Sequence, residues 1–544
     1  MKQKLDEKWQ SVDQLKNLLI DLVKIPSITG TADEVRFSND VFKMLQDLAY
    51  FQEHPEHLKL HGTNDGRKIL TALVKKGNCK DTVILLSHFD VVGVDDYGRW
   101  KELAFDPERL AEAFTSQLSL FSEEIQNDLR SGEWMFGRGT MDMKSGLALH
   151  MSILEKAAMN HFNGNVLLLT VCDEEVNSTG MRSAIPVIQD IAEKFALKYQ
   201  LCINSEPIFS NYPGDQTKYV YTGSLGKVLP AFYCMGKETH AAEPFTGLNA
   251  NYLASMVTCE MELNTIFCES VEGETTPPPT NLWQKDLKQG YSVQIPDRAV
   301  TLFNLFLMEK PLNQLAEELK QVASHAARKT AENYSRQKGL FTHTEEKLPN
   351  NFTINVFSFE ELLLYAEKKL GEDRIHHLYE KTISDIGMMD DRERSILLVD
   401  QLAQQCKELS PMIVLFFAPP YYPAVCSSKN ETVTRLVPKL IDYAKNQHDL
   451  ELVQQNYFSG LSDLSYIGPS GKDDIQILSS CMPLWNKGYH IPSDLLNHFQ
   501  IPVLNLGPWG KDPHKMSERL HIQYSFDKTR DMLEFTVKQL FLEN

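Results

Sequence analysis

The chain of 544 residues is too long for one ordinary hydrophobic core, so we expect about two to four domains. Its formal net charge of −18 argues against nucleic acid and anionic membranes as partners, because both require a basic face. No apolar run approaches the roughly 20 residues of a membrane-spanning helix, and the N-terminal segment lacks the apolar core of a signal peptide. The nine cysteines form no CxxC pair, which favours reduced thiols and a cytoplasmic location.

The first 212 residues alternate between helical and extended patterns, as expected for a mostly parallel sheet covered by helices. Residues 12–23 predict an amphipathic helix that ends near Pro26. The spacing after Asp142 predicts a second helix, which packs on the sheet. Short apolar runs predict buried central strands at residues 81–87, 165–171 and 199–205.

The pattern changes near residue 213 and returns to its first form near residue 428. Between these points the sequence predicts an extended segment at 288–306, helices within 312–337 and 359–407, and a strand at 411–417 closed by Pro419 and Pro420. A last strand is expected at 501–507.

The fold class that follows is α/β. Residues 1–212 and 428–544 are expected to form one discontinuous domain, a mostly parallel sheet with helices on both faces. Residues 213–427 are expected to form an interrupting α+β domain, which is enlarged by an insertion at about 341–410.

Five potential metal ligands lie where predicted strands or turns end. Each has an ordinary alternative: a structural histidine, a helix-capping aspartate, a solvated acidic turn, a plain strand-end acid or an exposed loop histidine. In open parallel sheets, however, ligands bind beyond the carboxyl ends of the strands, and the shared placement predicts a paired-metal site. The five residues are His88, Asp142, Glu175, Glu206 and His514.

Two further acids complete this prediction. Asp90 lies two residues after His88 and faces the same way in an extended chain, so it can fix the imidazole tautomer. Glu174 lies directly beside Glu175, where a base for a metal-bound water is needed.

Taken together, the segments LLSHFDVV, GRGTMDMKSG, DEEVNSTG, INSEP and GKETHAAEPFTGLNA, followed by the His514 loop, resemble the M20 family of metallopeptidases and amidohydrolases. The resemblance implies that His88, Asp142 and Glu206 hold one metal ion. It implies that Asp142, Glu175 and His514 hold the other, with Asp142 as the bridge. Glu174 would be the general base on the metal-bridging water, and Asp90 would orient His88. The ions are expected to be two divalent ions, zinc first, with manganese and cobalt as alternatives.

In this family the interrupting domain is a lid, and a lid histidine stabilises the tetrahedral oxyanion. The resemblance assigns this role to His240, on the pattern formed by Gly236, His240, Pro244, Gly247, Asn249 and Ala250. A histidine in a Gly/Pro loop would carry little meaning without the resemblance. As chemistry the role is sound, because a donor aimed at developing charge acts in the transition state.

The sequence departs from the family pattern in two ways. Many members carry an Asp-x-Arg on a lid strand to hold the substrate carboxylate, whereas Asn304 and Phe306 stand here. We therefore expect the carboxylate clamp to be absent, with no replacement named by the sequence. The lid is also unusually long, and family members with enlarged lids can imitate the dimer within one chain. The resemblance therefore implies a monomer with His240 acting in its own chain, the alternative being a homodimer formed through the lids.

The expected function is a two-metal hydrolase of amide bonds, either an N-acyl amino acid deacylase or a dipeptidase, acting on a small-molecule amide or dipeptide. The long chain, the enlarged lid and the acidic balance resemble the arginine-utilisation branch of the family, which implies arginine or amino-acid catabolism. The alternative is a catalytically inactive M20-like binding or regulatory protein. The intact ligands and Glu174 argue against that alternative.

Overall fold

The computed structural model describes residues 7–212, 214–342, 353–385, 389–468, 472–492, 495 and 500–542. The chain forms two compact units. Unit 1 contains residues 1–225, 425–469 and 492–544, and unit 2 contains residues 226–424 and 470–491. Of the expected insertion at 341–410, residues 343–352 and 386–388 lie outside the described residues.

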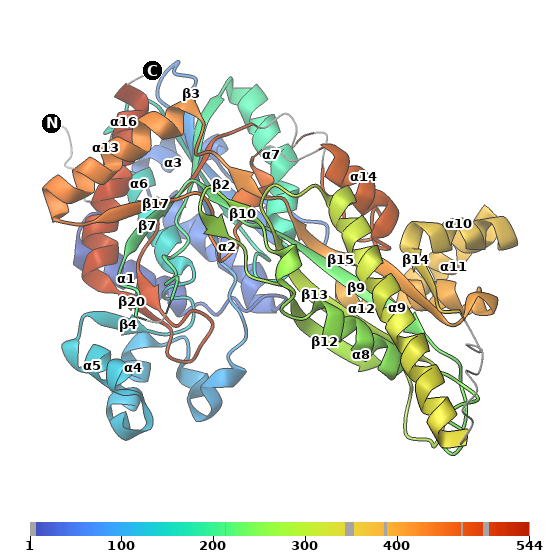
Figure 1. Ribbon diagram of the computed structural model, residues 1–544. Helices are drawn as coiled ribbons and strands as arrows, with labels where there is room; N and C mark the ends of the chain where they lie inside the picture. The colour runs from blue at the N-terminus through green and yellow to red at the C-terminus, as the bar shows by residue number, and fades with distance from the viewer. Residues whose placement is uncertain are drawn as a thin grey trace, which may run out of the picture. The chain divides into compact units, whose positions relative to one another are not determined.

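Unit 1 is built on an eight-stranded sheet with the order β1-β2-β5-β3-β6-β18-β7-β17 (Figure 1). The central strands β5, β3, β6 and β18 pair in parallel, and β1 and β2 add an antiparallel edge. The strands are β1 Leu58–Gly62, β2 Lys68–Val74, β3 Asp81–His88, β5 Asn165–Val171, β6 Lys198–Asn204, β7 Lys218–Tyr221, β17 Leu452–Gln455 and β18 Val503–Asn505.

Helices enclose this sheet. The helix after Asp142, α6, is buried over almost its whole circumference, because it packs against β2, β3 and β5 and also against α1 and α16. α7 packs against β2 and β5. The helices of unit 1 are α1 Val12–Val23, α2 Ala32–Gln46, α3 Ala49–Glu53, α4 Pro107–Thr115, α5 Glu123–Ser131, α6 Lys144–Ala158, α7 Thr179–Phe195, α13 Glu431–His448 and α16 Arg530–Leu542. The predicted α/β class, with a mostly parallel sheet between helices, is confirmed.

A second, three-stranded sheet in unit 1 has the order β19-β20-β4, with β4 at Trp134–Phe136, β19 at Gly510–Lys511 and β20 at Arg519–His521. It joins two segments that are far apart in the sequence. Two-residue strands β8 (Gly223–Ser224) and β16 (Val425–Cys426) pair where the chain leaves unit 1 and returns to it.

Unit 2 contains a five-stranded sheet with the order β12-β13-β9-β15-β14. Its strands are β9 Gly226–Met235, β12 Thr280–Asp286, β13 Arg298–Leu307, β14 Asn355–Ser358 and β15 Met412–Tyr422. Its helices are α8 Ala250–Met261, α9 Leu312–Thr342, α10 Phe359–Leu370, α11 Glu372–Asp385, α12 Asp391–Gln404 and α14 Lys472–Cys481. Figure 1 shows α8 and α9 running together along this sheet.

The two faces of the unit 2 sheet carry different helices. Thr301 of β13 bonds Thr258 of α8, whereas Arg298 bonds Asp400 of α12. Residues 298 and 301 point to opposite sides of a strand, so α8 and α12 cover opposite faces.

The strand expected at 411–417 was predicted to close at Pro419 and Pro420. That end was wrong: β15 continues through both prolines to Tyr422. The pairing of β15 with β9 is irregular between Ala418 and Tyr422. Where the pairing is irregular, the strand makes no regular ladder hydrogen bonds, so the missing N–H of a proline costs none.

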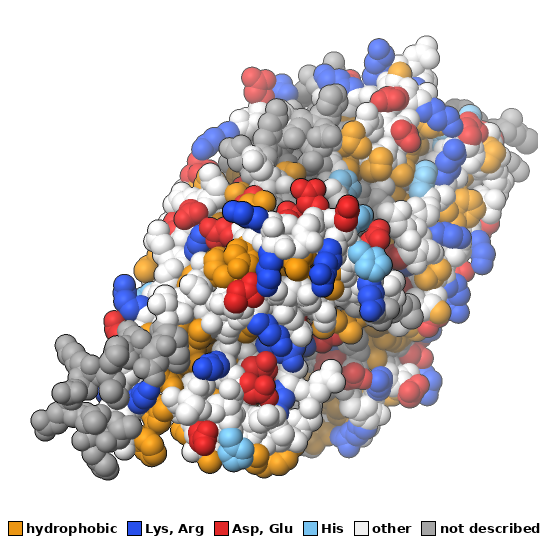
Figure 2. Space-filling view, turned by 90° about the vertical axis from the view of Figure 1, so that its right-hand side faces the viewer, with side chains coloured by type: hydrophobic (Ala, Val, Ile, Leu, Met, Phe, Trp, Pro, Cys, Tyr) orange, Lys and Arg blue, Asp and Glu red, His pale blue; other side chains and the backbone are white. Residues whose placement is uncertain are grey.

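Acidic and basic side chains are interspersed on the face seen in Figure 2, so the net negative charge is not concentrated on that face. Among the helices that the structure describes, none combines the length and the apolar character needed to cross a membrane.

Candidate metal centre

The parallel pairing of the central strands brings most of the predicted ligands to one edge of the sheet. His88 is the last residue of β3, Glu174 and Glu175 follow β5, and Glu206 follows β6. Since β5, β3 and β6 are neighbours and run in the same direction, their carboxyl ends meet at the same edge.

The three-stranded sheet brings the remaining two ligands to this edge. Asp142 lies in the turn between β4 and α6, and His514 lies in the loop between β19 and β20. β20 pairs with both β4 and β19, so the loop of His514 is fastened to the strand that leads to Asp142.

Five side chains form two groups that share Asp142. In the first group, His88 Nε2 lies 3.4 Å from Asp142 Oδ1 and 3.4 Å from Glu206 Oε1. In the second, His514 Nε2 lies 3.2 Å from Asp142 Oδ2 and 3.2 Å from Glu175 Oε2. Each oxygen of Asp142 therefore faces a different imidazole, which is the arrangement that a bridging carboxylate requires.

These distances fit metal ligation. A tetrahedral ion with bonds of about 2.0–2.2 Å to nitrogen and oxygen holds its ligand atoms about 3.3 Å apart. Glu175 Oε1 is buried and has no hydrogen-bond partner among the described residues. A buried carboxylate oxygen without a partner is costly unless a cation or a donor compensates for it. The donor set of imidazoles and carboxylates suits zinc, manganese or cobalt alike.

Asp90 organises the loop that carries the two adjacent glutamates. His88 Nδ1 lies 3.0 Å from the Asp90 backbone oxygen and 3.6 Å from its carboxylate. The carboxylate instead accepts from the backbone N–H groups of Glu174 and Glu175, at 3.0 and 3.2 Å, and from the hydroxyl of Thr29 at 2.9 Å. The contact that fixes the His88 ring is therefore chiefly to the backbone oxygen, whereas the sequence pattern pointed to the side chain.

The run of three acids at 173–175 is not a solvated turn. Asp173 is buried and bonds Arg67 at 2.7 Å, Glu175 faces His514, and the Glu174 carboxylate lies 3.9 Å from His88 Nε2. Burial raises the pKa of Glu174 well above its ordinary value. His88 opposes this shift, while the nearby carboxylates add to it.

The two imidazoles are held in a strongly anionic environment. Burial alone would lower the pKa of His514, but its bonds to Asp142 and Glu175 raise that pKa to about 11. The same competition, with Glu206 and Asp142 as the acids, raises the pKa of His88 well above its ordinary value. Both imidazoles hold the pKa of Asp142 below its ordinary value, although burial acts in the opposite direction.

The sequence patterns did not identify Glu518 as part of the site. It is completely buried, and its Oε1 accepts from the backbone N–H groups of Gly139, Met141 and Asp142, at 2.8, 3.2 and 3.4 Å. Its Oε2 accepts from the buried Arg138 at 2.7 Å. The four-residue spacing from His514 was the only sequence signal. Glu518 joins the two segments that supply Asp142 and His514.

His240 belongs to unit 2, whereas the seven other predicted site residues belong to unit 1. Its side chain is exposed, and its Nδ1 accepts from the backbone N–H of Ala242 at 3.1 Å. A neutral ring with an accepting Nδ1 carries its proton on Nε2, so His240 presents a hydrogen-bond donor.

Asn304 and Phe306 lie on the same face of β13 as Arg298. Both oxygens of Asp400 accept from Arg298 Nη1, at 3.2 and 3.0 Å. The arginine nearest to the expected clamp positions on this strand is therefore paired within unit 2.

The fold and the cluster define a metal-dependent hydrolase of the M20 type. The chain belongs to peptidase family M20/M25/M40, whose family model matches residues 84–478. It is 45% identical over 536 residues to the protein YqjN of Bacillus subtilis (strain 168), with 98% of each chain covered. It is 32% identical over 528 residues to the protein RocB of the same organism, covering 94% of this chain and 92% of RocB.

Among solved structures, the M20 family metallo-carboxypeptidase Sso-CP2 from Sulfolobus solfataricus has a similar fold. The TM-score is 0.56 at 14% identity, with 97% of this chain and 99% of that chain covered. The expected family membership is confirmed, and so is the expectation of an enzyme.

Proposed function

We propose that the chain is a two-metal hydrolase of amide bonds, which acts on N-acyl amino acids or dipeptides. The observation that carries this proposal is the position of Asp142, whose two carboxylate oxygens each face one imidazole and one further acid. Since His88, Asp142 and Glu206 are buried, such an arrangement has little structural purpose without cations, because it concentrates carboxylates in a poorly solvated place.

His88, Asp142 and Glu206 would hold one ion, and Asp142, Glu175 and His514 the other. Zinc is our first choice, and manganese and cobalt suit the same ligands. When bound, the ions supply Lewis-acid polarisation of the substrate carbonyl and a water of lowered pKa. Asp90 and Glu518 would keep the ligand loops in position through their bonds to backbone N–H groups.

Glu174 would be the general base. It follows Asp173 in the loop that Asp90 fixes, and its carboxylate lies close to the first group of ligands. In that position it would remove a proton from the attacking water and deliver it to the nitrogen of the leaving amine. Proton transfer by one positioned carboxylate typically contributes about 10²–10⁴-fold to the rate.

Unit 1 would be the catalytic domain and unit 2 the lid. The exposed Nε2–H of His240 would donate to the oxygen that becomes negatively charged as the carbonyl is attacked. This role rests on the family resemblance and on the donor state that Ala242 imposes on the ring.

The substrate class follows from the absent clamp. Asn304 and Phe306 offer no cation to a substrate carboxylate, and Arg298 is engaged by Asp400. A substrate whose carboxylate is blocked is therefore favoured over one with a free carboxylate, whether that is an N-acyl amino acid or a dipeptide. The similarity to the long-chain relatives is compatible with a role in arginine or amino-acid catabolism.

All nine cysteines are described and none forms a disulfide, which suits a cytoplasmic enzyme.

The test is the variant Glu174→Gln, assayed against a panel of N-acetyl amino acids and matched dipeptides, each with a free and with an amidated carboxylate. We expect kcat to fall by about 10²–10⁴-fold while the metal content is unchanged, because the amide cannot accept a proton. Glu155→Gln is a matched control: Glu155 is also buried in unit 1, but it accepts from the backbone of Lys8 and Trp9. A Glu174→Gln enzyme as active as the control would contradict the proposal.

A further inference from the structure

A short turn between α3 and β1 collects three metal-ligating side chains outside the centre described above. They are His54, Glu56 and His57, and their ligand atoms all lie within 4.8 Å of one another. Both imidazoles face the same carboxylate oxygen: His57 Nε2 lies 3.5 Å from Glu56 Oε1, and His54 Nδ1 lies 3.8 Å from it.

We propose that this turn holds a third divalent metal ion of the zinc type, bound by two imidazoles and one carboxylate. For such an ion the ligand atoms lie about 3.3 Å apart, so Glu56 Oε1 must approach each imidazole nitrogen by about 0.5 Å or less. The side chains of His54 and Glu56 are about half exposed, which leaves them free to make this adjustment. Two nitrogen ligands favour zinc over magnesium or calcium, which prefer oxygen.

The backbone of the turn is already in place for binding. Residues 55–57 form a 3₁₀ turn with Pro55 at its start, and His57 N–H donates to the His54 carbonyl at 3.1 Å. The two imidazole rings stand 5.3 Å apart and 20° from parallel. The turn therefore presents both rings on one side, and little backbone entropy is lost when an ion binds.

The buried member of the group has a fixed ring. His57 Nδ1 lies 2.9 Å from the hydroxyl of Tyr50, which also accepts from the backbone N–H of Lys75 at 2.7 Å. With an ion on Nε2, Nδ1 carries the proton and donates it to the Tyr50 oxygen. Ligating histidines usually have an outer partner of this kind, which sets the tautomer and the orientation of the ring.

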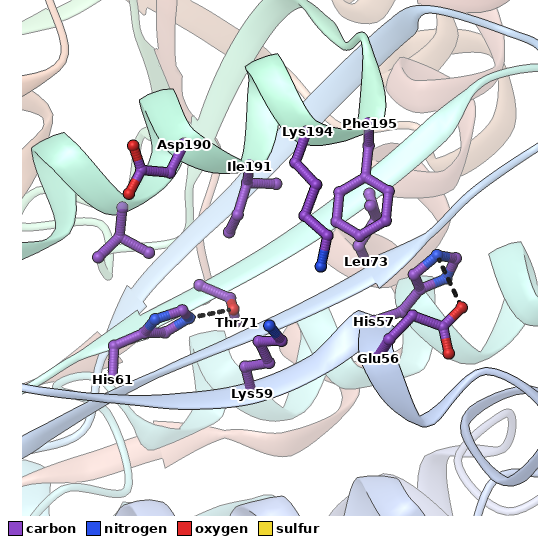
Figure 3. A pocket seen from close by; sticks show the side chains of 11 residues that line it. Glu56, His57, Lys59, His61, Thr71, Leu73, Asp190, Ile191, Lys194 and Phe195 are labelled. Atoms are coloured by element: carbon purple, nitrogen blue, oxygen red, sulfur yellow. Dashed lines mark hydrogen bonds and ion pairs between the residues drawn. The ribbon is translucent and has the colours of Figure 1, made fainter.

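The charged side chains around the turn are of both signs, so they neither exclude a cation nor bind one by themselves. Glu56 and His57 also line a pocket of about 250 Å³ between β1, β2 and α7. Figure 3 shows Lys59 and Lys194 reaching into this pocket from β1 and α7, with Asp190 on the same helix. Lys75 adds further positive charge near His57, so the surrounding charges do not attract a cation and the three ligand atoms decide the affinity. We therefore expect weaker binding here than at the paired centre.

The proposal is tested by titrating metal-free protein with Zn²⁺ in a calorimeter. We expect a weaker third binding event in the wild type, and its affinity should fall at least about tenfold in His54→Ala and in Glu56→Gln. His376→Ala is the matched control, because His376 is exposed on α11 and has one acid, Glu380, 3.5 Å away. That variant should keep all three events.

A His514→Ala protein separates this site from the paired centre: it should lose about one tightly bound equivalent but keep the weaker event. Tyr50→Phe should weaken the third event by about 10–100-fold without touching a ligand. The proposal is overturned if the wild type shows no third event up to millimolar Zn²⁺. It is equally overturned if the event persists unchanged in both His54→Ala and Glu56→Gln.

Discussion

Asp142 is the residue on which the candidate centre depends. Its position is set by groups that lie outside the ligand set, since its backbone N–H and those of Gly139 and Met141 converge on one oxygen of Glu518. A displacement of this turn would change the distances to both imidazoles at once. We therefore infer that Glu518 is a positioning residue for both proposed metal sites.

This role gives a prediction for Glu518→Gln. The amide can still accept the backbone N–H groups through its oxygen, but its NH₂ then faces the donor of Arg138. We expect metal affinity to fall by about 10–100-fold, as outer partners of ligands typically cause when they are replaced. Competition with a chromophoric chelator measures this metal affinity.

The control for this prediction is Glu269→Gln. Glu269 is likewise buried and accepts from three backbone N–H groups, those of Met308, Glu309 and Lys310, but it lies in unit 2. Both variants should lose some stability, and only Glu518→Gln should lose metal. Equal metal affinities in the two variants would show that Glu518 is structural only.

At the scale of elements, the sheet of unit 1 is closed on one side by α6, which is tied to the ends of β6 and β18. The hydroxyl of Ser205 donates to the Leu506 carbonyl at 2.9 Å, so it accepts from His150 Nε2 at the same distance. His150 is completely buried and neutral, and burial lowers its pKa to about 3.

The stability of unit 1 should therefore depend on pH through His150. The folded-state pKa lies below the ordinary value of about 6.5, so the unfolded chain takes up a proton that the folded chain cannot. The contribution of neutral His150 to the free energy of unfolding is complete above pH 6.5. It is lost as the pH falls below 6.5, by up to about 1.4 kcal/mol per pH unit.

We expect the free energy of unfolding to fall less steeply between pH 6.5 and 5 in His150→Gln than in the wild type. Denaturant titrations at several pH values measure this slope. His161→Gln, at an exposed position just after the same helix, should retain the wild-type slope. Equal slopes for His150→Gln and the wild type would refute the assignment.

Long apolar strands were the part of the fold that the sequence predicted well. The runs at 81–87, 165–171 and 199–205 correspond to β3, β5 and β6, because strands buried on both faces leave a continuous apolar signal. The parallel order of these strands is also why residues 88, 175 and 206 come together.

The short elements left no such signal. β4, β19 and β20 have two or three residues each, too few for a period to be recognised, yet they fasten the His514 loop to the Asp142 turn. The role of Glu518 was hidden for the same reason, since its partners are backbone N–H groups of a turn. Residues 470–491 belong to unit 2. The chain returns to that unit through contacts between residues far apart in the sequence, which local patterns do not reveal.

At the scale of the whole molecule, the enlarged second unit bears on assembly. Residues 355–358 form β14, which pairs with β15 and supplies the outer strand of the five-stranded sheet from within the chain. An edge strand is a common place for a second chain to add. Here the edge strand is β14, and its four residues offer few unpaired backbone groups to a second chain, which favours a monomer.

We expect sedimentation equilibrium to give a mass near 62.1 kDa at micromolar concentration. A second test mixes two inactive variants, His240→Ala and Glu174→Gln. If partners exchanged lid histidines, mixed dimers would regain activity at one of their two sites. We predict no recovery, and a dimer that restores activity on mixing would refute the monomer with His240 acting in its own chain.

The most direct test of the account is the metal content of the purified, desalted protein, measured beside His514→Ala and Asp142→Asn. We predict about two tightly held equivalents in the wild type, about one in His514→Ala and almost none in Asp142→Asn, because Asp142 serves both ions. A wild type that holds less than one equivalent after metal loading, or an Asp142→Asn protein that keeps two, would contradict the paired centre and the function built on it.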